Sequence, residues 1–90
     1  MPIVKFTYAL KRFSPDLTDT SVNGNSLSEL LNGIDLHYPG LRSYILDEQG
    51  RLRKHVNIFI EGELIRDREG LSDAFQKDSE VVIMQALSGG

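Results

Sequence analysis

Apolar and polar residues alternate along residues 4–10 and 55–60, which is the pattern of half-buried β-strands, and the second segment is the clearer of the two. Residues 80–87 form a strongly apolar run that also predicts a strand. A threonine-rich run at 17–22 predicts a hairpin partner for the first strand. A further short strand is predicted around residues 64–65, after a glycine turn. The chain therefore begins and ends with an apolar strand.

A different period occurs in the middle of the chain, where apolar residues recur at helical spacing. The residues on this face are Leu27, Leu30, Leu31, Ile34 and Tyr38. Ser26 stands three residues before Glu29, a capping box that predicts the helix start. Pro39-Gly40 predicts its end. Gly33 would lie inside this helix at a cost of about 1 kcal/mol relative to alanine. A helical turn is predicted at 71–75.

These elements predict an α+β roll in which one main helix covers a mixed sheet of four to five strands. A single helix of about three turns cannot bury its apolar face alone, so it must pack on the sheet. Residues 41–53 contain a turn signal at Asp47-Glu48-Gln49-Gly50 but predict no clear element. In the last strand, Val81 and Ile83 would then face the helix, and Val82 and Met84 would face away from it.

Composition narrows the function classes. Ninety residues predict one small domain, and 40% hydrophobic residues are ordinary for a globular chain. A net charge of −3 argues against nucleic acid as a partner. The absence of cysteine excludes a disulfide scaffold, a thiolate zinc site and a catalytic thiol. No segment approaches the ~18 apolar residues of a membrane span, so we expect a soluble cytoplasmic protein with no membrane partner.

No catalytic or metal-binding pattern emerges from the residues. His37 and His55 are the only histidines, and no His-x-x-x-His spacing exists. The carboxylates between Glu61 and Glu69 lie in predicted turns, where acidic residues are common. We therefore predict that the chain is not an enzyme and binds no metal.

The sequence closes with Gly89-Gly90, immediately after the last predicted strand. Glycine lacks a Cβ, so two in succession can thread a narrow channel. From Leu87 to Gly90 an extended tail would reach roughly 13 Å beyond the strand, at about 3.3 Å per residue. A partner enzyme could then grasp the terminal carboxyl. The alternative is a frayed end without a role.

Three stretches resemble the MoaD/ThiS family of sulfur-carrier proteins. They are the helix ending at Tyr38-Pro39-Gly40, the run from Arg53 to Arg66, and the tail from Asp78 to Gly90. The chain is most similar to the MoaD-like subgroup that includes CysO, a carrier of cysteine biosynthesis. This resemblance implies the ubiquitin-like β-grasp fold, with the first and last strands paired centrally. It implies a single domain over residues 1–90 with a flexible tail at 88–90.

The resemblance also implies a chemistry. The Gly90 carboxylate would be adenylated by a MoeB/ThiF-type enzyme that uses ATP, and then converted to a thiocarboxylate. This group would donate sulfide on an acceptor enzyme, such as a cysteine synthase or a molybdopterin-synthase-type subunit. The carrier itself would bind no cofactor. Gly89 and Ser88 would keep the tail slender. Gln85-Ala86 stands where the molybdopterin-synthase relative has two prolines, which argues against that pathway.

Docking residues follow partly from the resemblance. Met84 aligns with an exposed aromatic residue that family members use to bind the activating enzyme, and Val82 and Leu87 are also predicted to contact that enzyme. Arg12 could pair with acidic residues of that enzyme. The alternatives are an ordinary surface methionine and a solvated arginine. The basic run Arg53-Lys54-His55 is typical of a solvated strand end.

Two other function classes remain open at this point. A ubiquitin-like modifier would use the same adenylate but transfer Gly90 to a lysine amine of another protein. A non-covalent β-grasp interaction module would not need the diglycine at all. We expect a monomer in each case.

Overall fold

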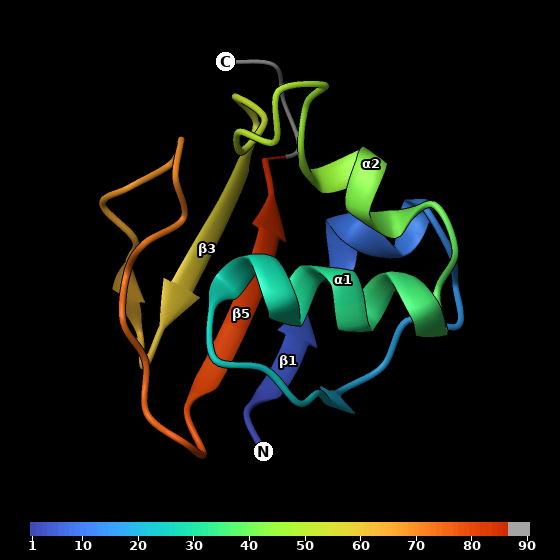
Figure 1. Ribbon diagram of the computed structural model, residues 1–90. Coiled ribbons are helices and arrows are strands. Elements are labelled where there is room, and N and C mark those ends of the chain that lie inside the picture. The colour runs from blue at the N-terminus through green and yellow to red at the C-terminus, as the bar shows by residue number, and fades with distance from the viewer. Residues whose placement is uncertain (87–90) are drawn as a thin grey trace.

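The computed structural model describes residues 1–86, and residues 87–90 lie outside the described part (Figure 1). One five-stranded sheet has the strand order β2-β1-β5-β3-β4. Its strands are β1 (Ile3–Phe6), β2 (Thr20–Ser21), β3 (Val56–Ile60), β4 (Glu63–Leu64) and β5 (Glu80–Gln85). The helices are the 3-10 helix η1 (Tyr8–Arg12), α1 (Leu27–His37) and α2 (Leu41–Ile45). In Figure 1, α1 crosses one face of the sheet.

The first and last strands pair at the centre of the sheet, as predicted. β1 runs parallel to β5, with Val4 opposite Val81 and Phe6 opposite Ile83. β3 lies antiparallel on the other side of β5. The short β2 and β4 close the two edges. The predicted mixed sheet with one main helix is therefore confirmed.

A single hydrophobic core lies between α1 and the sheet. Strand residues that are almost fully buried face the helix, among them Val4, Ile58, Val81 and Ile83. The helix contributes the leucines and isoleucine of its predicted apolar face: Leu27, Leu30, Leu31 and Ile34. The alternation of β5 is clear, because Val81 and Ile83 are 2% and 1% exposed whereas Val82 and Met84 are half-buried.

The predicted strand over residues 4–10 is wrong beyond Phe6. The Thr7 amide makes the last ladder bond, to the Ile83 carbonyl (3.1 Å), and η1 follows. Alternation over residues 4–10 would place Tyr8 on the same face as Val4 and Phe6, but Tyr8 is 86% exposed, whereas Ala9 and Leu10 are both buried. Successive strand residues point to opposite faces. A strand with one open face would expose one of these two neighbours, whereas a helical turn buries both, so packing overrides the alternation here.

Helix α1 begins where the sequence predicts. The Ser26 hydroxyl accepts a hydrogen bond from the Glu29 amide (3.1 Å), which caps the helix. The Glu29 carboxylate accepts from the Asn25 amide (2.9 Å), one residue earlier than in a standard capping box. The short helix α2 was missed. Its signal is the pair Leu41 and Ile45, which are four residues apart and both fully buried.

The helical turn predicted at 71–75 does not form. This segment is an irregular loop held by carboxylates. Asp73 accepts the amides of Arg66 (3.0 Å) and Asp67 (2.8 Å), and Asp67 in turn accepts those of Gly70 (2.8 Å) and Ser72 (3.2 Å). Short polar side chains that bond nearby amides compete with helix formation, which is why the weak apolar pattern fails here.

This carboxylate loop predicts a loss of stability in acid. Hydrogen bonds from the Ser72 hydroxyl and nearby amides lower the pKa of Asp67, and the Arg66 and Asp67 amides lower that of Asp73. A depressed folded pKa contributes stability above the unfolded value, about 3.9, that is lost as pH falls through the folded value. The free energies of unfolding of the wild type and of Asp73→Asn, measured with urea, should therefore approach each other as the pH falls below about 4. The control is Asp16→Asn, because Asp16 is exposed and its side chain accepts no hydrogen bond among residues 1–86. A difference in the free energy of unfolding between wild type and Asp73→Asn that does not change with pH would contradict the expectation.

Gly33 lies inside α1 because the helix passes very close to Val22. A Cβ at Gly33 would overlap Cγ1 of Val22, which is itself buried. Overpacking costs about 1–3 kcal/mol and the better helix propensity of alanine returns about 1 kcal/mol. We expect Gly33→Ala to lower the free energy of unfolding by about 1 kcal/mol, measured by urea denaturation. In a Val22→Ala background the same change should become stabilising; stabilisation in both backgrounds would refute the close-approach argument.

Candidate functional site

The end of β5 is where the predicted functional tail begins, and it is held on two sides. The Ala86 amide donates to the His55 carbonyl (2.9 Å), at the start of β3. The Tyr44 hydroxyl of α2 donates to the side-chain oxygen of Gln85 (3.0 Å). Figure 1 shows α2 and the 46–55 loop at the same end of the sheet as the end of β5. The tail residues Leu87, Ser88, Gly89 and Gly90 lie outside the described residues.

An apolar patch occupies the sheet face that α1 leaves open. Met84 and Val82 lie on this face, and Phe59 is the register partner of Val82. Leu64, opposite Phe59 on β4, is 53% exposed. We call Phe59, Leu64, Val82 and Met84 the open-face patch. The structure places two of the predicted docking residues, Val82 and Met84, in this patch; their docking role stays a prediction.

Arg12 is at a different place, at the last position of η1. It is exposed, and its side chain makes no hydrogen bond or ion pair within residues 1–86. η1 packs against β5, so Arg12 belongs to an element that adjoins the strand leading to the tail. A role for its charge in partner binding also stays a prediction.

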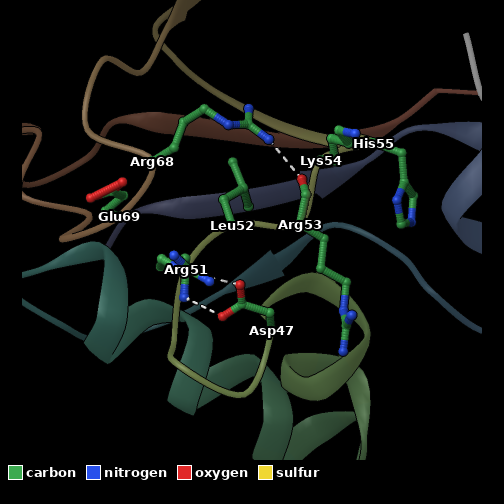
Figure 2. Close-up of a pocket in the computed structure, with 8 residues that line it drawn as sticks. All are labelled: Asp47, Arg51, Leu52, Arg53, Lys54, His55, Arg68 and Glu69. Atoms are coloured by element: carbon green, nitrogen blue, oxygen red, sulfur yellow. Dashed lines mark hydrogen bonds and ion pairs between the residues drawn. The ribbon is translucent and has the colours of Figure 1, made fainter.

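A basic cleft beside the end of β5 was not expected from the sequence. This cavity of about 550 Å³ lies between the 47–55 segment and Arg68-Glu69. Figure 2 shows the side chains that line it, contributed by the 47–55 segment and by Arg68-Glu69. The run Arg53-Lys54-His55 was interpreted as a solvated strand end, because only the fold brings Arg68 to it. We call this cavity the basic cleft.

Arg68 fixes the wall of the basic cleft nearest to β3. Its guanidinium donates to the Asn57 side-chain oxygen (2.8 Å), the Arg53 carbonyl (2.6 Å) and the Val56 carbonyl (2.8 Å). β4 pairs only with the far end of β3, so Arg68 satisfies the strand edge that β4 leaves free. It thereby holds the turn whose His55 carbonyl receives the Ala86 amide.

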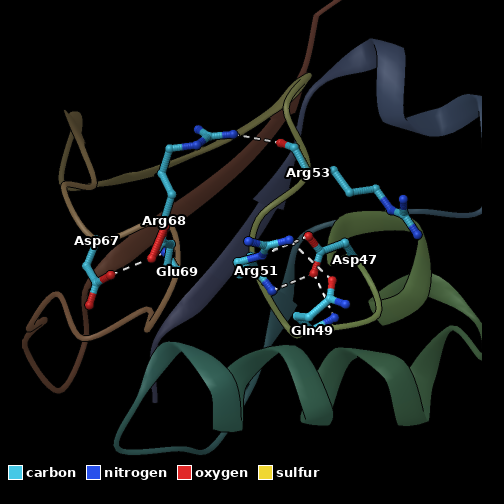
Figure 3. Close-up of polar contacts among 7 residues, drawn as sticks. All are labelled: Asp47, Gln49, Arg51, Arg53, Asp67, Arg68 and Glu69. Carbon is cyan, nitrogen blue, oxygen red and sulfur yellow. Dashed lines mark hydrogen bonds and ion pairs between the residues drawn. The ribbon is translucent and has the colours of Figure 1, made fainter.

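An ion pair shapes the opposite wall. The Arg51 side chain lies 3.2 Å from an oxygen of Asp47, and the same carboxylate accepts the amides of Gln49 and Arg51 (Figure 3). These bonds, led by the Arg51 amide, lower the pKa of Asp47. The predicted turn at Asp47–Gly50 is confirmed, with Gly50 in the left-handed region (φ 79°).

The other side chains that could have catalytic or metal-binding roles do not come together in one site within residues 1–86. His37 ends α1 and His55 precedes β3, so the two histidines belong to different elements. Within residues 1–86, no group of three or more histidine, aspartate or glutamate side chains is placed to hold a metal ion. In the same part of the chain, no helix has the length and apolar character needed to cross a membrane.

The fold and tail position agree with a known family. The family model of the ThiS family matches residues 4–90, nearly the whole chain. The chain belongs to the ThiS family. The resemblance to the MoaD/ThiS carriers in the sequence is therefore confirmed, and the match extends through Gly89-Gly90.

Within this family, individual relatives narrow the likeness further. The chain is 29% identical over 72 residues to the sulfur carrier protein CysO of Mycobacterium tuberculosis. This aligned region covers 78% of this chain and 77% of CysO. A crystal structure of the Amycolatopsis orientalis BexX/CysO complex superposes with a TM-score of 0.84 at 18% identity, over the full length of both chains. The small archaeal modifier protein SAMP1 of Methanosarcina acetivorans gives 0.78 at 25% identity, covering 99% of this chain and 95% of SAMP1. This ThiS-family chain thus has the ubiquitin-like β-grasp fold.

Proposed function

We propose that this chain carries sulfur as a thiocarboxylate on Gly90. The carboxylate oxygen attacks the α-phosphate of ATP on a partner enzyme, which forms an acyl-adenylate and releases pyrophosphate. A sulfide donor then attacks the acyl carbon, AMP leaves, and the thiocarboxylate remains. The observation that carries the proposal is the ThiS-family match over residues 4–90, which includes the diglycine. The CysO relative, itself named a sulfur carrier protein, supports it.

The described residues suit a carrier whose chemistry is performed by its partners. β5 lies between β1 and β3, so the strand that leads to the tail is clamped on both sides. The Tyr44–Gln85 and His55–Ala86 bonds extend this clamp to the last described residue. A rigid base fixes where a tail of roughly 13 Å can reach, at about 3.3 Å per residue. In this proposal the chain is not an enzyme and binds no cofactor, and ATP belongs to the activating enzyme.

The partners in this proposal are a MoeB/ThiF-type adenylating enzyme and a sulfur-acceptor enzyme. The likeness to CysO favours an acceptor of the cysteine-synthase type over a molybdopterin-synthase-type subunit. The sequence Gln85-Ala86 favours the same choice, for the reason given above.

Intact-mass spectrometry tests the central step. The chain is incubated with a MoeB/ThiF-type enzyme, ATP and a sulfide source, and its mass should rise by the difference between one sulfur and one oxygen atom. Omitting ATP should abolish the shift, because the free carboxylate is a poor electrophile. An unchanged mass with each of several such enzymes, while each one activates its own carrier, would reject the proposal.

The open-face patch predicts a measurable docking contribution. Replacing Met84 by aspartate puts a charge into the middle of the patch, so the activating enzyme should bind more weakly. We expect KM for the carrier to rise about tenfold in an ATP–pyrophosphate exchange assay, with little change in kcat. Leu36→Asp is the matched control, because Leu36 is 85% exposed on α1 rather than on the sheet. Equal KM values for the two variants would remove the patch from the docking surface.

The likeness to SAMP1, which is named a modifier protein, supports a second candidate function. A modifier would use the same adenylate but form an isopeptide bond with a lysine of another protein. Affinity capture from cells followed by peptide mapping distinguishes the two. Gly90 linked to lysine side chains would favour the modifier, and a thiocarboxylate terminus without such links would favour the carrier.

A further inference from the structure

The basic cleft carries a positive charge that its surroundings do not neutralise. Four of the chain's ten lysines and arginines line it, against two of its thirteen carboxylates. The chain as a whole has a net charge of −3, so this local excess of cations opposes the overall balance. Of these four cations, only Arg51 forms an ion pair within residues 1–86, and its partner is Asp47. A partly enclosed patch of one sign attracts groups of the opposite sign.

The guanidinium groups of Arg53 and Arg68 are held in place by neutral atoms. Arg53 donates from two nitrogens to the Ser43 carbonyl (3.1 and 2.9 Å), and Arg68 donates to two carbonyls and an amide oxygen. Such acceptors satisfy hydrogen bonds and fix geometry but carry no net charge. Figure 3 shows the Arg68 guanidinium directed at the Arg53 carbonyl rather than at the neighbouring Glu69. The charge is thus fixed in position yet still available.

The occupant of the cleft is more readily a carboxylate-bearing protein segment than a free phosphate. Phosphate sites characteristically use several free backbone N–H groups. Here the amides of Arg51, Leu52 and Arg53 are already bonded, to Asp47, to the Arg68 carbonyl and to the Ile45 carbonyl respectively. These three amides therefore offer no donor to an anion, and the lysine and arginine side chains that line the cleft pair well with Asp and Glu carboxylates.

The cleft also adjoins the base of the tail. His55 lines it, and the His55 carbonyl holds the Ala86 amide. Asn57, which accepts a bond from Arg68, is the register partner of Met84 in the open-face patch. A protein that grips the tail and covers the patch would therefore also cover the cleft.

We propose that the basic cleft binds an acidic segment of the enzyme that activates the carrier. The inference rests on the proposed function, since it assigns a surface to the same activation step. Charged pairs at the edge of an interface chiefly raise the rate of productive encounter. The segment orients the carrier so that its tail meets the adenylation site, while the open-face patch supplies apolar contact area.

Charge reversal at one exposed lysine tests the assignment. Lys54 is exposed and lines the cleft, whereas Lys77 is exposed in the turn before β5, at the opposite end of that strand. Lys54→Glu should raise KM for the carrier about tenfold in ATP–pyrophosphate exchange, with kcat unchanged. Lys77→Glu, with the same change of net charge, should stay within about twofold of wild type. The difference should shrink near 1 M salt, where the Debye length is about 3 Å.

Equal KM values for the two variants, or a difference that ignores salt, would overturn the proposal. A second measurement separates it from the carrier function itself. A tetraglutamate peptide is titrated into the ¹⁵N-labelled chain and amide shifts are followed by NMR. Shifts confined to residues 51–55 and 68–69, and lost in Lys54→Glu, support the site even if no enzyme activates the wild type. Shifts of equal size around Lys11 and Lys77, or unchanged binding by Lys54→Glu, refute it.

Discussion

Extending the chain by Ala-Ser after Gly90 is expected to abolish the sulfur mass shift completely. The proposed chemistry needs a free carboxylate on Gly90, and a peptide bond at this position converts that carboxylate into an unreactive amide. The new terminal carboxylate would lie roughly 7 Å further along the chain, at about 3.3 Å per residue, behind two residues that carry a Cβ. Intact mass after incubation with the activating enzyme, ATP and sulfide gives the readout.

The matched control adds the same two residues before Met1, at the opposite end of the chain. The Met1 amino group pairs with the exposed Asp78 (2.9 Å), and exposed pairs contribute little to stability. This control should keep the full mass shift. A C-terminally extended chain that still carries both added residues and gains the sulfur mass would refute Gly90 as the reactive position.

The strands at the centre of the sheet follow directly from the sequence. In β5, and in β3 as far as Phe59, the period of two expected of a strand matches the observed alternation of buried and half-buried positions, because α1 covers one face of the sheet and leaves the other open. The same holds for α1, where the capping residue Ser26 and the apolar face give the helix start and its orientation. Local pattern predicts an element well when local and tertiary preferences agree.

The missed elements are those in which tertiary contacts decide the backbone. β1 stops at Phe6 and gives way to η1 because Ala9 and Leu10 are buried together. α2 is too short to show a periodic pattern, and its burial depends on packing against α1. The 71–75 loop follows the carboxylates of Asp67 and Asp73 rather than its apolar residues.

The candidate site likewise has one part that local sequence pattern predicts and one part that depends on tertiary contacts. Val82 and Met84 were expected on the open face from strand alternation alone, and that orientation is observed. The basic cleft could not be predicted, because Arg51, Lys54 and Arg68 are brought together only by two loops that the alternation leaves undefined. A weak signal existed in the excess of cations between residues 51 and 55 in an otherwise acidic chain.

Arg68, which lines the basic cleft, also stabilises the folded chain. Replacing it by methionine keeps much of the side-chain volume but removes three hydrogen bonds, to Asn57, Arg53 and Val56. Hydrogen bonds to charged groups contribute about 1.5–3 kcal/mol each, but water can reach a half-buried side chain and replace part of them. We therefore expect the free energy of unfolding to fall by about 2–3 kcal/mol in total, measured by urea denaturation.

Hydrogen exchange should show where this loss is felt. Arg68 holds the turn that supplies the His55 carbonyl, so in Arg68→Met the Ala86 amide should exchange faster than the decrease in global stability alone explains. Arg66→Met is the control, because Arg66 is an exposed arginine of the same loop whose side chain makes no hydrogen bond within residues 1–86. Surface changes of this kind stay within about 0.5 kcal/mol. If both variants unfold at the same urea concentration, Arg68 does not support the base of the tail, and β5 alone determines where the tail begins.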